Sequence, residues 1–432
     1  MREQAGLGEE KRVNGMVYKR IRSFFLSGFF VANAIALTGT AAFMFLSYLY
    51  HFAMVRLLEP ATYGELSVLV GVISILLMPA QTIQTVFARE VAKLDAQRRF
   101  AEGFAVARAH MRDVFVWGAA AALAGIILLE LAKPFFASGF VFFLQLILLF
   151  VPVWYALYVA RGFLQGKEWV LAVSSVLVAE PFLKVLLAVV FVWLGWGLLG
   201  ALVPIELAAL ILLLPLAWYF LASHPRAKPV PIRFGPSFKP VLATNVLLMS
   251  LLYLDLFAVA FFRGSADAGY YNVAGITSRI LYFVAGGLLL VFLPKSSKLG
   301  LGQARELGWL LLKTLAFLVP AFLVFILFPQ EFIFLFYTPK YHPAVLPFVI
   351  LSVGLFLFSS FYLVLNLLWS QHRERFALLL SAAALLIDAL LLGLLVPPLG
   401  MAGAALSTTI ASALLFVSGA LYLAGHLRQG KN

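Results

Sequence analysis

The most regular feature of the sequence is a series of long apolar runs separated by short polar segments. Each run is about 20 residues or longer, the length that an α-helix needs to cross roughly 30 Å of hydrocarbon. The pattern predicts an all-α polytopic membrane protein with twelve transmembrane helices. The predicted spans are residues 27–55, 66–87, 113–131, 140–160, 170–193, 198–221, 241–262, 270–293, 309–328, 344–369, 376–396 and 400–424.

Basic residues are distributed unevenly between the two sides of these spans. If both termini are cytoplasmic, 26 of the 32 Lys and Arg residues fall in cytoplasmic segments, four in outer connections and two within spans. Cytoplasmic loops of membrane proteins carry an excess of Lys and Arg. The asymmetry therefore predicts a multi-pass protein of the cytoplasmic (inner) membrane with both termini in the cytoplasm.

The twelve predicted helices divide into two sets of six. Residues 48–68 align with 253–273 at an offset of 205, with seven identities in 21 positions, among them Gly64 with Gly269. Each half has an even number of spans, so we expect two lobes related by a pseudo-two-fold axis along the membrane normal, with the substrate site between them. The predicted domains are an N-terminal segment 1–26, an N-lobe 27–222, a linker 223–240, a C-lobe 241–424 and a tail 425–432.

Composition argues against most other classes of protein. The chain is 63% hydrophobic and 12% charged, whereas a soluble domain has about 25% charged residues. There are no cysteines, which excludes disulfides and thiol chemistry. The sequence has no P-loop, GxSxG or HExxH motif and no metal-ligand spacing of histidines, so we expect neither an enzyme nor a cofactor nor a metal. The cytoplasmic loops account for the net charge of +13, so we expect no nucleic-acid partner.

Three short motifs give the chain a family resemblance. They are Arg56-Leu-Leu-Glu-Pro60-Ala-Thr-Tyr63-Gly64 after the first span, Arg161-Gly162-Phe-Leu-Gln165-Gly166 after the fourth, and Asp255 with Ala268-Gly269-Tyr270-Tyr271 around the seventh and eighth. With these motifs the chain resembles, over nearly its whole length, the polysaccharide and oligosaccharide-lipid flippases of the multidrug/oligosaccharidyl-lipid/polysaccharide exporter superfamily. The resemblance implies a two-lobed transporter that works by alternating access.

The resemblance also implies a substrate and partners. The flippases move polyprenyl-diphosphate-linked sugars to the outer leaflet for surface polysaccharide biosynthesis. Twelve spans, rather than the fourteen of peptidoglycan-precursor flippases, favour an O-antigen or capsule-type repeat unit. The implied partners are this lipid-linked sugar, the lipid bilayer, a proton or sodium ion, and the polysaccharide polymerase machinery. The alternative is a cation-coupled multidrug exporter of the same superfamily, which predicts an acidic cavity.

Ionisable residues within the spans are the main functional signal, because a charge at the bilayer centre costs about 2.5 to 3.5 kcal/mol. Counting about 1.5 Å per residue from the outer helix ends places five of them at a common depth of about 10 to 13 Å. The five are Lys184, Glu206, Asp255, Arg279 and Asp388, and Glu180 lies one helical turn before Lys184.

The two cations of this set predict an anion-binding cavity. Lys184 and Arg279 suit a diphosphate, because a guanidinium offers a planar fork of donors and an ammonium a compact charge. Arg56 and Arg89, at opposite ends of the first two helices, are candidates for passing the anion in or out. The alternative is structural pairing of Lys184 with Glu206 or Glu180, and of Arg279 with Asp255.

The acidic residues predict coupling to an ion gradient or counter-charges for the cations. Glu206, Asp255 and Asp388 are candidate proton or cation sites, because a carboxylate in a low-dielectric cavity can cycle its proton. Pro79, before the polar run Gln81-Thr82-x-Gln84-Thr85, and Pro181, beside Lys184, are candidate gating bends. We interpret Trp154, Tyr155 and Tyr158 as interfacial anchors, with stacking on sugars as the alternative.

Overall fold

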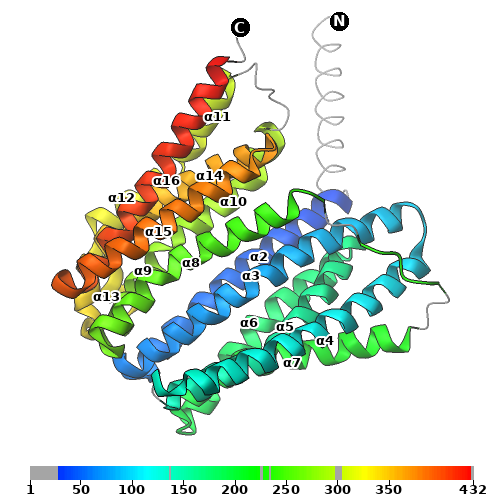
Figure 1. Cartoon of the computed structure of the whole chain (residues 1–432), viewed down its shortest axis with the longest axis horizontal. Coiled ribbons are helices and arrows are strands. Elements are labelled where there is room, and N and C mark those ends of the chain that lie inside the picture. Colours follow the sequence, from blue (N-terminus) through cyan, green and yellow to red (C-terminus); the bar gives the residue numbers. More distant parts are fainter. Residues whose placement is uncertain (1–27, 136–137, 224–226, 233–234, 297–303, 430–432) are drawn as a thin grey trace, which may run out of the picture.

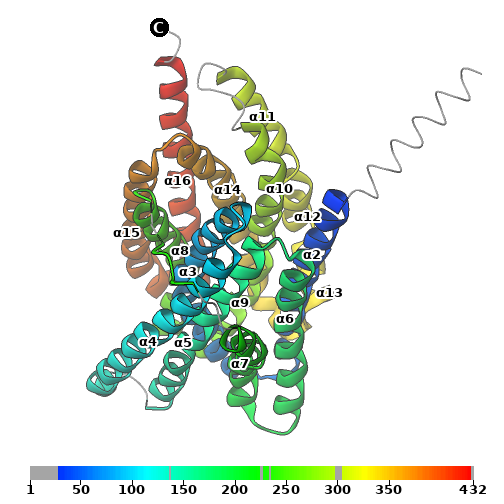
Figure 2. The same cartoon turned by 90° about the vertical axis from the view of Figure 1, so that its right-hand side faces the viewer.

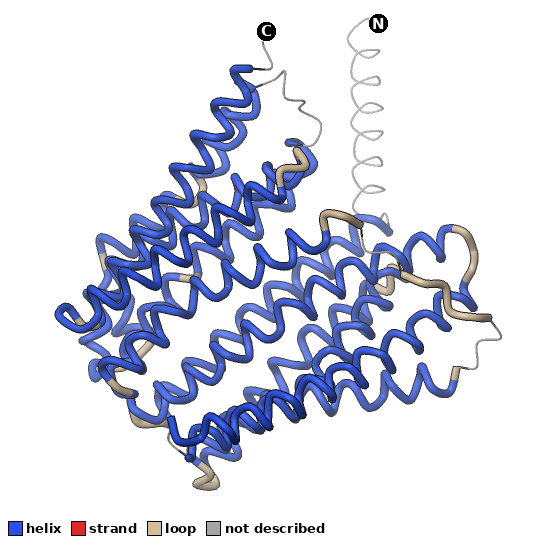
Figure 3. The backbone as a smooth tube through the Cα atoms, viewed as in Figure 1, coloured by secondary structure: helices blue, strands red, loops and turns tan. Residues whose placement is uncertain are grey.

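The computed structural model describes residues 28–135, 138–223, 227–232, 235–296 and 304–429. The predicted N-terminal segment 1–26 and parts of the linker and tail lie outside these residues. Figure 3 shows that the described chain consists of helices and short loops. Twelve helices among the described residues are long and apolar enough to span a membrane, which agrees with the predicted number.

The helices fall into two consecutive groups. The N-lobe contains α2 (Gly28–Leu57), α3 (Pro60–Ala96), α4 (Phe100–Ala132), η1 (Lys133–Phe135), α5 (Ser138–Gly166), α6 (Val170–Trp193) and α7 (Gly197–Ala222). The C-lobe contains α8 (Phe238–Arg263), α9 (Ser265–Ser278), α10 (Ile280–Ser296), α11 (Ala304–Ala316), α12 (Val319–Leu327), α13 (Pro329–Phe336), η3 (Pro339–Ala344), α14 (Val345–Ser370), α15 (Glu374–Leu399) and α16 (Met401–Gln429).

Several helices extend beyond the predicted spans. Helix α3 begins at Pro60 rather than residue 66, α4 begins at Phe100 rather than residue 113, and α5 continues to Gly166 instead of ending at residue 160. The eighth span is divided between α9 and α10 at Arg279. Hydropathy detects only the apolar centre of a helix, so polar turns at its ends were assigned to loops.

The two lobes repeat one packing scheme. In the N-lobe α2 packs on α6, α3 on α5, and α6 on α7; in the C-lobe α8 packs on α15, α9 and α10 on α14, and α15 on α16. The lobes meet where α3 lies beside α8 and α9, near the middle of the molecule in Figure 2. Below, the inner ends of the helices are those predicted to face the cytoplasm, and the outer ends are the opposite ones.

The contact between α3 and α9 is reciprocal. A Cβ atom on Gly64 would lie 1.8 Å from the carbonyl oxygen of Ser265, and one on Gly269 would lie 2.1 Å from the carbonyl oxygen of Pro60. Pro60 and Ser265 are equivalent at the offset of 205, as are the two glycines. Each half therefore presents the same surface to the other, as a two-fold axis requires.

A hydrogen-bonded pair continues this contact one turn further along the helices. The side-chain amide of Asn272 donates to the hydroxyl of Ser67 over 2.7 Å and to that of Tyr63 over 3.1 Å. Ser67 and Asn272 are also equivalent at the offset of 205. The pseudo-two-fold axis thus passes between two buried polar side chains that bond to each other.

The lobes are joined at their outer ends and diverge toward their inner ends (Figure 1). At the outer ends the ammonium of Lys340 donates to the carbonyl oxygen of Leu58 over 3.3 Å, and the hydroxyl of Tyr341 donates to that of Val55 over 3.4 Å. These contacts join η3 of the C-lobe to the last turn of α2 and to the residue that directly follows it. The described form is therefore closed on the outer side.

Candidate functional site

The two cations predicted to bind substrate lie in different lobes, and each lies on a tyrosine ring. Lys184 of α6 places its Nζ 4.5 Å from the centre of the Tyr50 ring. Arg279, between α9 and α10, places its Cζ 4.1 Å from the centre of the Tyr253 ring and donates from Nη2 to the carbonyl oxygen of Leu252. Aromatic faces attract cations, so the rings hold both charges without neutralising them.

His51 of α2 shows that the two cations share one neighbourhood. It lies within electrostatic range of both Lys184 and Arg279. Its Nδ1 is 3.3 Å from the hydroxyl of Tyr63, the same hydroxyl that accepts a hydrogen bond from Asn272 of the other lobe. The positive region therefore lies next to the polar contact between the lobes.

Structural pairing of the two cations stays a prediction, because Glu180 lies within electrostatic range of Lys184 and Asp255 within that of Arg279. Among the ion pairs within the described residues, none includes Lys184 or Arg279. Glu180 pairs with Arg161 instead. Glu206 accepts a hydrogen bond of 2.7 Å from the indole Nε1 of Trp154. Both carboxylates thus have partners within the N-lobe, and Trp154 is a buried donor rather than an interfacial anchor.

The carboxylates of the C-lobe form a separate cluster between α8, α9, α15 and α16. Asp255 accepts hydrogen bonds from the hydroxyls of Tyr271 over 2.7 Å and Thr408 over 3.2 Å. Asp388 accepts one from the hydroxyl of Ser407 over 2.7 Å. Asp388 is fully buried, and its Oδ2 has no hydrogen-bond partner among the described residues.

Arg56 and Arg89 are not brought to the central cations. Both are exposed, and Arg56 donates to the carbonyl oxygen of Phe52 in the last turns of α2. Arg89 lies 15 residues beyond Ser74 of α3, which corresponds to about 22 Å along the helix. Ser74 itself contacts Tyr253, the ring beneath Arg279. A role for Arg56 and Arg89 at the two ends of a transport path stays a prediction.

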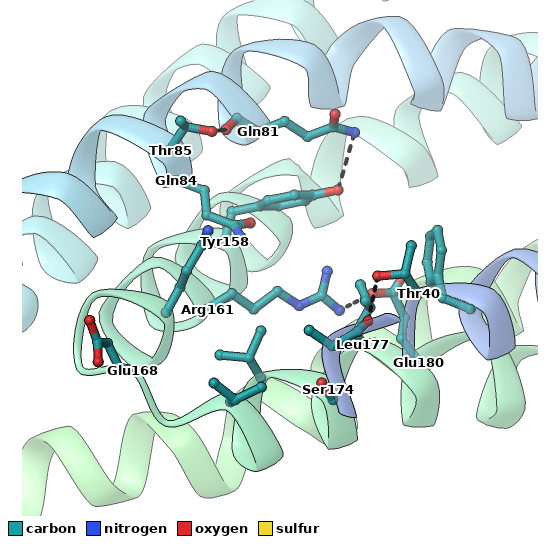
Figure 4. Close-up of a pocket in the computed structure, with 15 residues that line it drawn as sticks. Thr40, Gln81, Gln84, Thr85, Tyr158, Arg161, Glu168, Ser174, Leu177 and Glu180 are labelled. Atoms are coloured by element: carbon teal, nitrogen blue, oxygen red, sulfur yellow. Dashed lines mark hydrogen bonds and ion pairs between the residues drawn. The ribbon is translucent and has the colours of Figure 1, made fainter. Parts of the chain in front are cut away.

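A cavity of about 540 Å³ lies in the inner half of the N-lobe (Figure 4). It separates the α2–α6 pair from the α3–α5 pair, because α2 and α3 hardly touch each other. The lining residues are Ala36, Thr40 and Phe43 of α2, Gln81, Gln84 and Thr85 of α3, Tyr158, Arg161 and Gln165 of α5, Glu168, and Val170, Val173, Ser174, Leu177 and Glu180 of α6.

Arg161 is the central residue of this cavity and was not predicted as a site residue. Its guanidinium forms an ion pair with Glu180 and lies 5.4 Å from the centre of the Tyr158 ring. The side chain is 4% exposed, and its Nε has no hydrogen-bond partner within the part of the chain that the structure describes. Figure 4 shows the guanidinium directed into the space beneath Tyr158 and Gln81.

The apolar pattern ends the fourth predicted span at residue 160, so Arg161 is predicted to lie beyond the helix, next to two glycines. In the structure these glycines continue α5 and bring it against α3. A Cβ on Gly162 would lie 3.0 Å from the carbonyl oxygen of Gln84, and one on Gly166 would lie 2.5 Å from that of Ala88. Small residues that allow close helix contacts are typical of membrane proteins. Gly162 and Gly166 are spaced four residues apart, as on one helix face, and this was the signal that Arg161 is helical.

No family model matches the sequence, and no curated protein matches it either. Solved structures do match. A MOP superfamily transporter from Pyrococcus furiosus superposes with a TM-score of 0.60 at 16% identity, over 93% of this chain and 96% of that one. The MATE multidrug transporter DinF-BH in complex with R6G superposes with a TM-score of 0.65 at 17% identity, over 90% and 93%.

A third match is a MATE protein in its straight conformation, with a TM-score of 0.62 at 14% identity over 91% of this chain and 95% of that chain. The chain therefore has the fold of these solved structures. This is the two-lobed, twelve-helix fold that the sequence resemblance implies. At these identities the likeness concerns the fold, and the substrate has to be inferred from the site.

Proposed function

We propose that the protein is a flippase that moves a polyprenyl-diphosphate-linked oligosaccharide across the cytoplasmic membrane by alternating access. The observation that supports this proposal most strongly is the positive charge that Lys184 and Arg279 place between the lobes. Lys184 of the N-lobe and Arg279 of the C-lobe lie on aromatic rings, and among the described residues neither has a carboxylate within ion-pair distance. An anionic headgroup between the lobes gives these two cations the partner that an intramembrane charge requires.

The same observation argues against the multidrug exporter of cations. A cationic drug needs a carboxylate that faces the substrate path. Here Glu180 is paired with Arg161, Glu206 with an indole, and Asp255 and Asp388 with hydroxyls inside the C-lobe. The P. furiosus transporter of this fold is described as having a binding pocket of reverse polarity that suggests a different function. This description supports the use of pocket charge to distinguish one function from another.

The closed outer side supports transport that starts from the inner side. In this form η3 covers the outer end of α2, while the helices diverge at their inner ends (Figure 1). We propose that a lipid-linked sugar enters from the cytoplasmic leaflet, that its diphosphate reaches Lys184 and Arg279, and that the outer contacts then open. The polymerase machinery receives the product on the outer side.

We further propose that Asp255 and Asp388 couple transport to a proton or sodium ion. Both carboxylates and the neighbouring hydroxyls of Thr408 and Ser407 supply oxygen ligands, which hard cations prefer. The Oδ2 of Asp388 is buried without a partner among the described residues, and such an atom is stabilised by a proton or a cation. The site spans α8, α15 and α16, so its occupancy bears on how these helices pack.

The test of the proposed function compares Lys184→Gln and Arg279→Gln with the unmodified protein. The protein is reconstituted into liposomes, and the inward-to-outward movement of an undecaprenyl-diphosphate-linked oligosaccharide is measured. A charge-assisted hydrogen bond contributes about 1.5 to 3 kcal/mol, so we expect each variant to lower transport at limiting substrate by about tenfold or more. Arg112→Gln, at an exposed arginine that pairs with Asp113 on α4, is the matched control and should leave transport unchanged.

Transport that is unaffected by both substitutions contradicts the anion site. Efficient export of R6G, with no movement of the lipid-linked sugar, contradicts the flippase and supports the multidrug exporter.

A further inference from the structure

We propose that the N-lobe cavity is a saccharide subsite, which receives the uncharged sugar residues next to the diphosphate of the substrate. The inference rests on the proposed flippase function and adds to it a place for the glycan. Its occupant is a neutral hexose or N-acetylhexosamine. The cavity volume of about 540 Å³ falls within the range of ligand pockets, which is about 300 to 1,000 Å³.

The lining of the cavity leads along α6 toward the cation that is proposed to hold the diphosphate. Its α6 lining, from Val170 through Ser174 and Leu177 to Glu180, recurs every three or four residues and therefore follows one helix face. Lys184 is the next residue on this face, four residues after Glu180 and about 6 Å further along the helix. A sugar bonded to a phosphate at Lys184 therefore reaches this end of the cavity.

Helix α2 lines the opposite side of the cavity and leads to the same cation. Its lining residues are Ala36, Thr40 and Phe43. Tyr50, whose ring lies beneath Lys184, follows Phe43 by seven residues, which is two helical turns on the same face. Both walls thus lead from the cavity to the proposed phosphate position.

The lining has the donors and acceptors that hydroxyl groups require. The side-chain amide of Gln84 donates to that of Gln165 over 3.1 Å, and the amide of Gln81 donates to the hydroxyl of Tyr158 over 3.5 Å. Each amide has two donor hydrogens and an acceptor oxygen, so these bonds leave capacity for a ligand. The hydroxyls of Thr40 and Thr85 line the same space.

The charge of the cavity favours a neutral ligand. Arg161 and Glu180 form an ion pair inside it, so their charges cancel. Glu168 is exposed at the inner rim. Glu180 is paired with Arg161 and therefore does not attract a cationic drug, and the carboxylate of Glu168 at the rim repels an acidic sugar.

Arg161 also offers a specific contact to a sugar. Its Nε has no partner among the described residues although the side chain is 4% exposed. A buried donor without a partner costs free energy, and a sugar hydroxyl or acetamido oxygen would satisfy it. The ring of Tyr158 lies beside the guanidinium and offers an apolar face to the C–H groups of a pyranose.

The experiment measures binding to the purified full-length protein in nanodiscs. The probes are undecaprenyl diphosphate alone and the same lipid carrying neutral mono- to trisaccharides of hexose or N-acetylhexosamine. The variants are Gln84→Leu with Gln165→Leu, and Arg161→Gln with Glu180→Gln, which keeps the cavity neutral. Gln145→Leu, at a glutamine of α5 that bonds to Glu130 outside the cavity, is the matched control.

We expect the cavity variants to weaken binding of the sugar-bearing probes about tenfold, or about 1.4 kcal/mol, and to leave binding of the bare diphosphate unchanged. Lys184→Gln should weaken both. Equal binding of bare and sugar-bearing lipid by the unmodified protein overturns the saccharide subsite, as does an unchanged affinity in both cavity variants. A loss of R6G binding, rather than sugar binding, in these variants assigns the cavity to cations and overturns it too.

Two outcomes distinguish a failure of this inference from a failure of the proposed function. If the diphosphate binds and depends on Lys184 but the sugars add nothing, only the subsite is wrong. If no lipid diphosphate binds, the flippase is wrong, and binding of free neutral trisaccharides, measured with Thr85→Val as a further cavity variant, still decides the subsite. Thermal unfolding of each variant identifies those that fail to fold, and Thr85→Val keeps the buried ion pair intact.

Discussion

Buried charges in this protein are stabilised in ways that differ with their sign. Lys184 and Arg279 lie on tyrosine rings, while Glu206 accepts from an indole and Asp388 from a hydroxyl. Among the ion pairs of the described residues, Arg161–Glu180 is the most buried, with side chains 4% and 14% exposed. An aromatic face stabilises a cation but leaves it able to attract an anion. In the proposed function, this difference lets Lys184 and Arg279 attract an anionic substrate.

Asp388→Asn tests ion coupling at a single residue. The substitution keeps the size of the side chain but removes its charge and its exchangeable carboxyl proton, so we expect flipping without a gradient to persist and stimulation by a proton or sodium gradient to be lost. The measurement is the transport rate in liposomes with and without each gradient. Ser381→Ala, at a buried hydroxyl of the same helix, is the control. Stimulation that survives in Asp388→Asn contradicts coupling at this carboxylate.

Single charges within apolar runs could be predicted from the sequence, but their partners could not. Lys184 and Arg279 stood out because they interrupt predicted spans. The partner of Glu180 is Arg161 on a different helix, and no local spacing reveals such a contact. Arg161 itself lies beyond the apolar centre of α5, where hydropathy no longer distinguishes a helix from a loop.

At the level of helices, the repeat determines how the lobes touch. Gly64 and Gly269 occupy equivalent positions near the beginning of α3 and α9, and each faces the backbone of the other helix. Close approach of backbones lets membrane helices associate through packing. The number of spans could be predicted from the apolar pattern within each helix, and the repeat from the alignment of two segments 205 residues apart. The helix ends could not be predicted, because the polar terminal turns of α3, α4 and α5 resemble loops in sequence.

Gly64→Ala tests whether this helix contact closes the outer side. The added Cβ would overlap the carbonyl oxygen of Ser265 at 1.8 Å, so the lobes must separate there. Overpacking typically costs about 1 to 3 kcal/mol, and we expect labelling of Ser67→Cys by an outside thiol reagent to rise about tenfold. Gly393→Ala, where nothing lies within 4 Å of the added Cβ, is the control. Unchanged labelling means that the contact does not govern closure.

On the scale of the whole molecule, the contacts between the lobes at the pseudo-two-fold axis lie on the closed, outer side. The reciprocal glycines, the Ser67–Asn272 hydrogen bond and the η3 contacts to α2 all lie toward the outer ends. The proposed phosphate cations and the saccharide cavity lie on the inner side of this closure. Alternating access requires that the outer contacts break while the substrate is held. Opening must therefore separate Ser67 from Asn272.

A cross-link between these two positions provides the last prediction. The natural chain contains no cysteine, so Ser67→Cys with Asn272→Cys places the only thiols of the protein on the axis, where the native side chains are 2.7 Å apart. We expect a short thiol-reactive cross-linker to abolish flipping, and a reducible one to allow recovery on reduction. Binding of the lipid diphosphate from the inner side should persist, because the cross-link holds the form in which that side is open.

The control pair joins two helices of one lobe. Glu130→Cys with Gln145→Cys connects α4 to α5, where the native side chains are 2.8 Å apart. Alternating access moves one lobe against the other and leaves each lobe largely rigid, so this cross-link should not slow transport. Full transport by the cross-linked Ser67–Asn272 pair would mean that the lipid-linked sugar crosses without separation of the outer ends, and a fixed path through the protein would replace alternating access.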